Sequence, residues 1–168
     1  MQTLPSIDRI RELLDYCPST GLLTWKEYRN SQAVKGQEAG YVSAEGYRVI
    51  GLDNKVYQSH RLAWAHYYGS WPERQLDHIN HNREDNRILN LREVTHTQNQ
   101  RNRSRNRTNT SGTTGVYNPR PGRWLARICV DRKQLNLGTF CSYYEAVAAR
   151  KAAEEKYHYH PNHGLHGQ

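Results

Sequence analysis

The chain has 168 residues and a mass of 19.6 kDa, which suits one ordinary domain or two small ones. Hydrophobic residues make up 36%, the mean hydropathy is −1.00, and no run approaches the roughly eighteen apolar residues of a membrane span. The first residues, MQTLPSIDRIRELL, lack the apolar core of a signal peptide, and the 3 cysteines form no C-x-x-C pair. We therefore expect neither a membrane-spanning nor a secreted protein, but one with free thiols in a reducing cytoplasm.

The positive charge is concentrated in one segment. Residues 101–140 hold 9 Lys and Arg and a single acid, Asp131, whereas the charges before and after this segment cancel. The whole formal charge of +8 thus lies in forty residues, which indicates a polyanionic partner. Because the segment has no amphipathic apolar face and no lipidation motif, nucleic acid is favoured over a membrane surface.

The N-terminal third alternates helical and extended patterns. Apolar residues at helical spacing predict a helix over residues 7–16, capped by Ser6. Short β-prone runs between Gly21 and Ser59, with an Asp53-Asn54 turn, predict a small antiparallel sheet. Residues 60–68 read as a second helix whose inward side chains are Leu62, Ala63, Ala65 and Tyr68.

The C-terminal third begins with an Arg-, Asn-, Ser- and Thr-rich run that has no apolar periodicity, so we expect a flexible linker over residues 104–112. The runs TTGVY, RWLARICV and KQLNLGTF then predict three strands. Ser142 and Glu145 predict a capping box and a helix, with an apolar stripe of Tyr144, Val147, Ala148 and Ala152. The tail has four histidines within residues 158–166; disorder is the favoured interpretation and metal binding the minority one.

The residues that could carry chemistry lie between these parts. Asp77 and His78 are expected at the end of a strand, before an Asn-rich loop, a second strand and a helix that carries Asn99. A carboxylate and an amide oxygen suit Mg²⁺ or Mn²⁺, and a neutral imidazole beside them could accept a proton from attacking water. A helix N-terminus favours a phosphate nearby, so the set suffices for metal-assisted phosphodiester hydrolysis. Taken singly, each residue would more often be structural, for example in an Asx-turn.

The ordered set is more specific than its members. Residues 57–103, with SHRLAWAHYYGSWP, LDHINHNREDNRILNLREVT and TQNQRNR, closely resemble the HNH nucleases of bacteriophage and intron-encoded homing endonucleases. The resemblance implies a ββα-metal fold with one divalent cation, with Asp77 and Asn99 as metal ligands and His78 as general base. It also implies that Asn90 bridges the loop and fixes the orientation of the histidine. The family often has His where this chain has Asn99, and an amide oxygen there favours Mg²⁺ over zinc.

Other residues compete for these roles. His60, His66, His81 and His96 are alternative histidines, and His81 is near enough in sequence to contact DNA, although an exposed loop histidine is the favoured interpretation. Arg61 could cap a helix or hold a phosphate.

A second resemblance covers residues 111–157. The carrying residues are Gly115-Val116, Gly122-Arg123-Trp124, Ala126-Arg127-Ile128, Leu137-Gly138-Thr139-Phe140 and Glu145-Ala146, which are similar to the Apetala-type (ethylene-response-factor-like) DNA-binding domain. The resemblance implies that a three-stranded sheet lies in the major groove, with one helix behind it. The residues it places on DNA are Arg120, Arg123, Trp124, Arg127 and Arg132, and those it places in the core are Leu125, Ile128, Val147 and Ala148. The residue pattern agrees with a strand: Arg123, Leu125 and Arg127 alternate with Trp124, Ala126 and Ile128 with a period of two, although Leu125 among the arginines blurs the two faces.

Together these observations predict an α+β protein. We expect a small N-terminal helix and β region (1–56), an HNH nuclease core (57–103), a basic linker (104–112), an Apetala-like DNA-binding domain (113–160) and a disordered tail (161–168). The predicted function is a metal-dependent DNA endonuclease of the homing or phage type that leaves a 5′ phosphate and a 3′ hydroxyl. The arginines of the linker region that we expect to follow the DNA backbone are Arg101, Arg103, Arg105 and Arg107.

The remaining expectations concern partners and rivals. The partner is double-stranded DNA and not a membrane, the chain acts as a monomer or weak dimer, and its place is the cytoplasm, that of the host cell if a phage encodes it. One rival is a DNA-binding regulator whose HNH centre is inactive. The other is an RNA-binding or RNA-cutting protein, which only the basic character supports.

Overall fold

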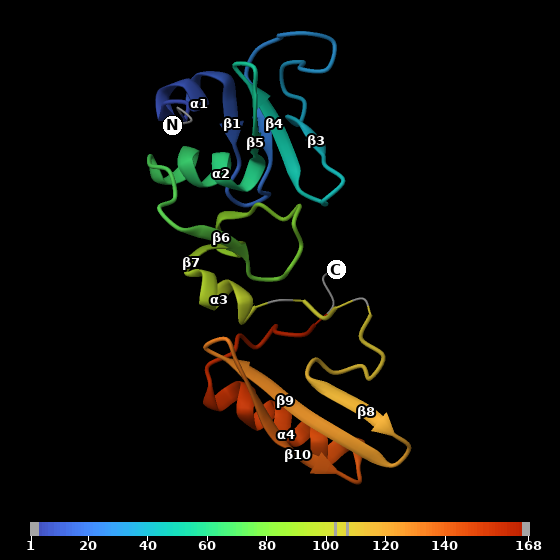
Figure 1. The fold of residues 1–168 in the computed structure, drawn as a ribbon. Helices are drawn as coiled ribbons and strands as arrows, with labels where there is room; N and C mark the ends of the chain where they lie inside the picture. The colour runs from blue at the N-terminus through green and yellow to red at the C-terminus, as the bar shows by residue number, and fades with distance from the viewer. Residues whose placement is uncertain (1–3, 103, 107, 166–168) are drawn as a thin grey trace. The chain divides into compact units, whose positions relative to one another are not determined.

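The computed structural model describes residues 4–102, 104–106 and 108–165. The chain divides into two compact units, Met1–Val94 and Thr95–Gln168, each described below by itself (Figure 1). The division falls inside the segment 57–103 that the sequence groups as one nuclease core. Within the described residues, the helices are too short or too polar to span a bilayer.

The first unit begins with helix α1, Ile7–Leu13, whose N-cap Ser6 accepts a hydrogen bond from the Arg9 backbone N–H at 3.1 Å, as predicted. The helix ends before the predicted Tyr16, because Leu14–Tyr16 extends as strand β1 and pairs with β2, Leu23–Trp25. In this pairing Leu14 lies opposite Trp25, and both side chains are buried. Their burial outweighs the helical pattern that Leu14 shares with the residues before it.

A three-stranded antiparallel sheet follows, formed by β3 (Tyr41–Val42), β4 (Arg48–Leu52) and β5 (Lys55–Gln58). Strands β4 and β5 meet in a two-residue turn at Asp53 and Asn54, whose φ angles of 47° and 62° are those of a hairpin turn with a left-handed backbone. The small sheet and its turn are as predicted from the sequence.

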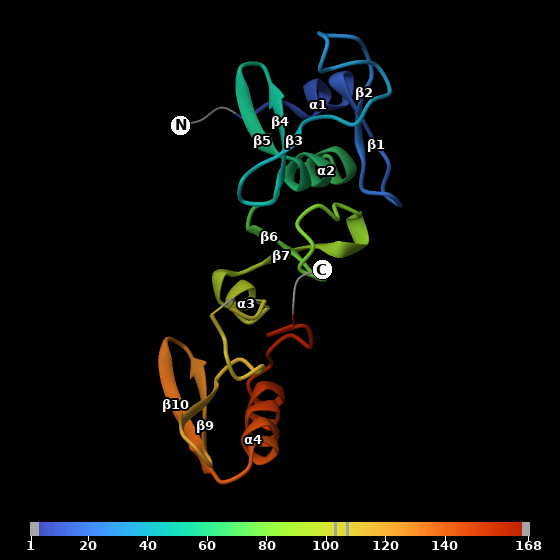
Figure 2. The ribbon, with the colours of Figure 1, turned by 90° about the vertical axis from the view of Figure 1, so that its right-hand side faces the viewer.

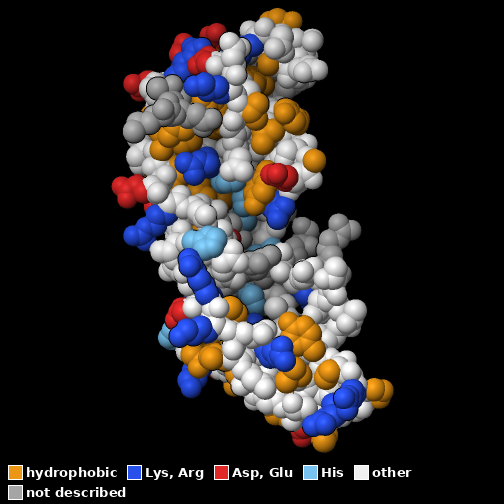
Figure 3. Space-filling model, in the orientation of Figure 1, with side chains coloured by type: hydrophobic (Ala, Val, Ile, Leu, Met, Phe, Trp, Pro, Cys, Tyr) orange, Lys and Arg blue, Asp and Glu red, His pale blue; other side chains and the backbone are white. Residues whose placement is uncertain are grey.

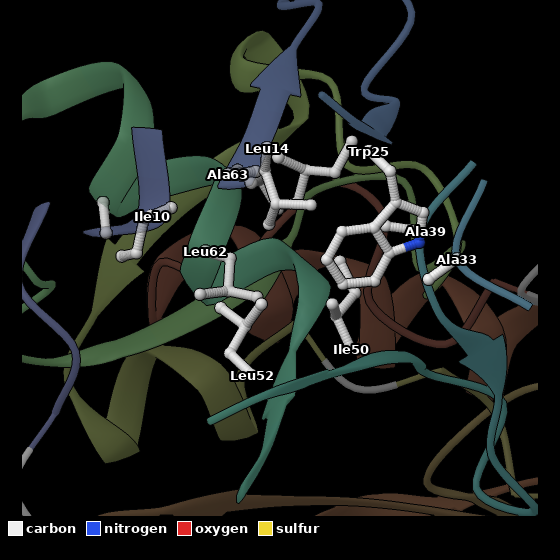
Figure 4. Close-up of a cluster of buried hydrophobic side chains, with 12 residues drawn as sticks. Ile10, Leu14, Trp25, Ala33, Ala39, Ile50, Leu52, Leu62 and Ala63 are labelled. Atoms are coloured by element: carbon white, nitrogen blue, oxygen red, sulfur yellow. The ribbon is translucent and has the colours of Figure 1, made fainter. Parts of the chain in front are cut away.

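Helix α2, Ser59–Tyr68, contributes to the core of this unit. Leu62 and Ala63 lie with Ile10, Leu14, Trp25, Ile50 and Leu52 in one buried cluster (Figure 4). Ala65 is buried as predicted, but the prediction for Tyr68 is wrong: its side chain is 52% exposed. The ring of Tyr68 packs instead on Trp64 of the same helix, with centroids 4.3 Å apart.

The first unit ends in a two-stranded sheet. Strand β6, Gln75–His78, pairs with β7, Leu91–Val94, and the connecting loop closes with a 3-10 turn, η1, over Ile88–Asn90. In the second unit, α3 covers His96–Gln100 and begins with the predicted capping box between Thr95 and Gln98. The predicted order of strand, loop, strand and helix is therefore confirmed.

The second unit is a sheet of three antiparallel strands with one helix on one face (Figure 2). The strands are β8 (Val116–Arg120), β9 (Arg123–Val130) and β10 (Lys133–Phe140), with β9 in the centre, and the helix is α4 (Tyr143–Lys156). Ser142 caps α4 by accepting from the Tyr144 N–H at 3.2 Å. Strands β9 and β10 and the helix appear where the sequence predicts them, whereas β8 begins three residues later than the predicted run TTGVY.

The buried face of α4 differs from the predicted stripe. Val147 packs against the core, but Tyr144, Ala148 and Ala152 are exposed. The buried side chains are instead Ala146, Arg150, Ala153 and Glu154. Arg150 and Glu154 can lie inside because they pair with each other at 2.8 Å, which satisfies both charges. The buried face of the helix is therefore not the purely apolar one.

The segments expected to be flexible carry hydrogen bonds in their described parts. In the linker, the Arg105 N–H donates to the Leu165 carbonyl at 3.1 Å. In the tail, His163 is buried and its Nε2 lies 3.2 Å from Nη2 of Arg150. Residues 161–165 thus differ from the expected disorder, because a buried arginine needs polar partners and the tail supplies one. Residues 166–168 of the predicted tail lie outside the described residues.

Candidate active site

Asp77 and His78 are the last two residues of β6, as predicted, and both are buried. Asp77 lies opposite Arg92 in the β6–β7 register, and its Oδ2 accepts from Nε and Nη2 of Arg92 at 3.1 and 2.8 Å. The buried carboxylate therefore has a cationic partner across the strand, as a charge at low solvent exposure requires. Sequence reasoning missed Arg92, and the strand register alone brings it to Asp77.

The ring of His78 lies among polar and aromatic neighbours. Its Nε2 is 3.1 Å from Oδ1 of Asn86, and its ring centroid is 5.0 Å from that of His60 in an edge-to-face contact. Burial lowers the pKa of His78, and the hydrogen bond with Asn86 opposes part of this effect. The imidazole is consequently neutral at pH 7, the state in which it can accept a proton.

Asn90 closes the loop between the two strands. Its Oδ1 accepts from the Asn80 N–H at 3.0 Å, and its Nδ2 donates to Oδ1 of Asn80 at 3.0 Å and to the Asp85 carbonyl at 2.8 Å. The resemblance assigns to Asn90 the bridging of this loop, and these contacts cross it. That Asn90 also sets the orientation of His78 stays a prediction, because the side chain hydrogen-bonded to the ring belongs to Asn86.

His60, a competing histidine in the sequence, lies beside His78 at the start of α2. Its side chain is buried, and burial, followed by the charges of His78 and Arg61, lowers its pKa to about 3. The ring of Tyr47 contacts both histidines, with centroids 5.5 Å from His60 and 6.1 Å from His78. The sequence pattern does not predict this cluster, because Tyr47 precedes β4, His60 lies in α2 and His78 ends β6.

The other histidines are placed differently. His81 follows in the loop with a left-handed backbone, φ 66°, and its N–H donates to the His78 carbonyl. His66 lies on α2, where its Nε2 is 3.2 Å from the Leu14 carbonyl, and His96 begins α3. Arg61 lies over the ring of Trp71 at 5.8 Å, so its guanidinium is engaged in the first unit.

The second expected metal ligand, Asn99, lies on α3 in the second unit. The described residues contain no group of three His, Cys, Asp or Glu side chains placed to hold a metal. The expected ligands are instead one carboxylate and one amide oxygen, the donor types that hard divalent cations prefer. The Asp77 carboxylate is a donor of this type, its Oδ2 is paired with Arg92, and the ligand pair itself stays a prediction.

The arginines expected on DNA lie in varied surroundings. Arg101 pairs with Asp131 at 3.6 Å and lies over the ring of Tyr159 at 5.8 Å, and Arg105 donates to the Gly112 carbonyl. Arg103 and Arg107 lie outside the described residues. Arg132 occupies the β9–β10 turn with φ 65° and is exposed.

The sheet of the second unit has one face covered by α4 and one face in solvent. Arg120 and Arg123 are register partners across β8 and β9, and Arg127 follows on the same face of β9, because side chains alternate along a strand. Figure 3 shows the strand side of this unit, where Lys and Arg side chains (blue) outnumber Asp and Glu side chains (red).

Three assignments from the Apetala-type resemblance are corrected by the structure, and one of them is Ala148, which is exposed on α4 and lies outside the core. Trp124 lies on the helix side, where its ring is 4.8 Å from that of Tyr143, so it does not share the arginine face. Leu125 does share that face, opposite Tyr117 and Thr139, and is therefore outside the core beneath α4. Strand alternation is the physical reason: Trp124 shares its face with Ala126 and Ile128, and Leu125 shares its face with Arg123 and Arg127.

Comparison with known proteins addresses the segment that contains the buried Asp-His pair. Residues 57–101 match the HNH endonuclease family. This HNH segment (residues 57–101) is about a quarter of the chain, contains Asp77, His78, Asn90 and Asn99, and runs across the boundary between the two units. The match supports a nuclease of the HNH type. No curated protein and no solved structure matches the chain. The Apetala-type likeness of residues 111–157 stays a prediction.

Proposed function

We propose that this protein is a metal-dependent DNA endonuclease of the HNH type, of the homing or phage kind. The observation that carries the proposal is the position of His78 in the HNH segment: a buried, neutral imidazole directly follows a buried carboxylate at a strand end. That pair combines a proton acceptor with an oxygen ligand for a cation.

In the proposed reaction, His78 accepts the proton of the water that attacks the phosphodiester. Asp77 and Asn99 would hold Mg²⁺ or Mn²⁺, which when bound stabilises negative charge on the phosphate and on the leaving 3′ oxygen. Asn90 holds the two ends of the loop beyond His78 together through its contacts with Asn80 and Asp85. The products are a 5′ phosphate and a 3′ hydroxyl, and one centre in each chain, acting as a monomer or weak dimer, is suited to nicking.

The second unit is the proposed DNA-binding part. Thr95–Gln168 carries the whole formal charge of +8, since the acidic and basic residues of Met1–Val94 cancel. We assign to DNA the solvent face of the sheet with Arg120, Arg123 and Arg127, together with Arg132 in the turn. These guanidiniums suit contacts with phosphates or with guanine edges in a groove. The arginines of residues 101–107 would add contacts to the backbone.

The test is a cleavage assay on supercoiled plasmid and on duplex and single-stranded RNA, with Mg²⁺ and with EDTA. We expect Mg²⁺-dependent nicking of the plasmid, and no cutting by Asp77→Ala or by the milder Asp77→Asn, because each removes a carboxylate ligand. Asn99→Ala should cut much more slowly. Asp15→Ala, which removes an exposed carboxylate of the same unit, is the matched control and should cut like the wild type.

The outcomes separate the rival functions. DNA binding by all proteins without cleavage by the wild type would favour the regulator with an inactive centre, and cleavage of RNA alone would favour a ribonuclease. Cleavage by Asp77→Ala at the wild-type rate would show that Asp77 is not a metal ligand.

A further inference from the structure

We propose that Asn86 is a positioning residue for His78, and that the N-terminal region holds Asn86 in place through Tyr16 and Gly21. This inference rests on the proposed function, in which His78 is the general base. It assigns a role in the active site to a part of the chain outside the HNH segment.

Asn86 contacts the ring of His78 directly. Oδ1 of Asn86 lies 3.1 Å from Nε2 of His78, and both side chains are buried, with exposed fractions of 2% and 5%. An amide oxygen can only accept a hydrogen bond, so the hydrogen of the neutral imidazole is on Nε2. Nδ1 is then the nitrogen that carries the lone pair, so Asn86 determines which ring atom acts as the base.

Strand β1 supports the backbone of Asn86. The hydroxyl of Tyr16 donates to the Asn86 carbonyl at 2.7 Å, across 70 residues of chain. Burial raises the pKa of Tyr16, which keeps the phenol protonated and able to donate. On the other side, the Asn86 N–H donates to the Glu84 carbonyl at 3.1 Å. The backbone of Asn86 is thus held at both its donor and its acceptor.

The β1–β2 turn also approaches the β6–β7 loop closely. Gly21 has φ +79°, and a Cβ built on it would lie 2.4 Å from the Arg87 nitrogen and 2.6 Å from the Asn86 carbonyl carbon. Only glycine allows this approach of backbone to backbone. Nearby, the Ile88 N–H donates to the Pro18 carbonyl at 3.3 Å. The β1–β2 turn therefore limits where the loop backbone can lie at Asn86, the residue that contacts His78.

The resulting chain of contacts runs from Tyr16 and Gly21 to Asn86 and from Asn86 to His78, all within the first unit. It differs from the role of Asn90, whose side-chain partners are Asn80 and Asp85. Asn90 closes the loop, whereas Asn86 aims the ring. The two roles predict different effects on the state of the imidazole.

The first measurement is the tautomer of His78, read from ¹⁵N chemical shifts of the full chain labelled at histidine, without metal or DNA, at about pH 8. The wild type should show the hydrogen on Nε2 of His78. Asn86→Ala should give a mixture of both tautomers, and Asn86→Asp, which keeps an oxygen acceptor, should restore the wild-type form. Asn30→Ala is the matched control, because Asn30 is an exposed asparagine of the same unit that caps the Gln32 N–H at 2.9 Å.

The support from the N-terminal region has its own matched pair. Gly21 and Gly36 both have φ +79°, so alanine adds the same backbone strain, but Gly36 has no atom within 4 Å of the added Cβ. Gly21→Ala should disturb the tautomer of His78 and Gly36→Ala should not. If Gly21→Ala does not fold, Tyr16→Phe, compared with the exposed Tyr28→Phe, tests the same support.

The second measurement is single-turnover nicking with Mg²⁺. Asn86→Ala should lower the rate constant of cleavage roughly tenfold to a hundredfold, the usual effect of removing a group that orients a reacting histidine, with little change in DNA affinity. Unchanged tautomer and unchanged cleavage in Asn86→Ala would overturn the inference. If the wild type cut no DNA but its tautomer depended on Asn86 and Gly21, the proposed function would fail while the positioning contact stood.

Discussion

A histidine acts as a general base only while its ring is neutral and aimed at the water that it deprotonates. At His78, burial lowers the pKa and keeps the ring neutral, while Asn86 contacts it directly. The neighbouring His81 lies three residues further on, in a left-handed turn that closes the loop backbone onto His78. Two histidines that are nearly equivalent in the sequence therefore have different surroundings.

This difference predicts a contrast in rate. His78→Ala should cut DNA more slowly by roughly two to four orders of magnitude, because a positioned base is lost, while metal and DNA still bind. His81→Ala should lose much less. Single-turnover nicking with saturating protein measures both variants. Equal losses in the two would move the base to another residue, and no loss in either would make the HNH mechanism untenable.

At the scale of elements, helix α2 and the end of β6 bury two histidines against each other, and this burial lowers the stability of the fold at acidic pH. The pKa of His60 is lowered to about 3 in the folded chain, below its unfolded value of about 6.5, so the unfolded state binds more protons as the pH falls. The stability of the first unit is consequently complete above about pH 6.5 and is lost as the pH falls from there toward 3.

This loss can be measured as a free energy of unfolding. Between pH 7 and pH 5, His60 alone should lower the stability of the wild type by about 2 kcal/mol, and His78 adds in the same direction. His60→Asn should reduce this pH dependence, whatever its effect on stability at pH 7. Urea unfolding followed by tryptophan fluorescence at the two pH values gives the comparison. An unchanged slope in His60→Asn would contradict the assigned protonation state of His60.

The arginines on the solvent face of the second unit's sheet predict the salt dependence of DNA binding. Replacing Arg120, Arg123 and Arg127 together by Gln should reduce the slope of log affinity against log salt by about three, since each contact with a phosphate releases nearly one counterion. The matched control replaces Lys35, Lys55 and Arg74, which removes the same charge from the first unit and should change the slope little. Filter binding of duplex DNA over a salt series measures both. Equal slopes in the two triple variants would remove the sheet face from the DNA interface.

At the scale of the molecule, charge and chemistry lie in different units. Met1–Val94 has a balanced charge and contains Asp77 and His78, whereas Thr95–Gln168 has the excess of +8. The boundary lies inside the HNH segment, between β7 and α3. A cut near Asn106, inside the expected linker 104–112, would separate Arg101 and Arg105 from their partners, which are Asp131 and the Leu165 carbonyl.

The division predicts the behaviour of the separated units. Residues 95–168 alone should bind duplex DNA at about 50 mM salt with strong salt dependence, because this fragment carries the excess positive charge. Residues 1–94 alone should bind weakly, because their charges cancel. Gel-shift titrations at two salt concentrations test this. Equal binding by the two fragments would mean that DNA affinity does not follow the charge.

The sequence by itself determined the elements and the residues of the candidate centre. Helix caps at Ser6 and Thr95, the Asp53-Asn54 turn and the alternation along β9 are local patterns, and local patterns are set by neighbours in the chain. Asp77 and His78 were identified because the ordered motif of the loop is specific even though its single residues are common.

Only the tertiary structure decided what contacts these residues. Because Arg150 pairs with Glu154, the buried face of α4 includes these two charged residues and differs from the apolar stripe. Because Leu14 is buried opposite Trp25 in a strand pair, α1 ends before it. Arg92 reached Asp77 through the strand register, and Tyr16 reached the loop across 70 residues. Such contacts depend on distances between segments that folding brings together, and the free energy of burial and of buried hydrogen bonds overrides local preference there.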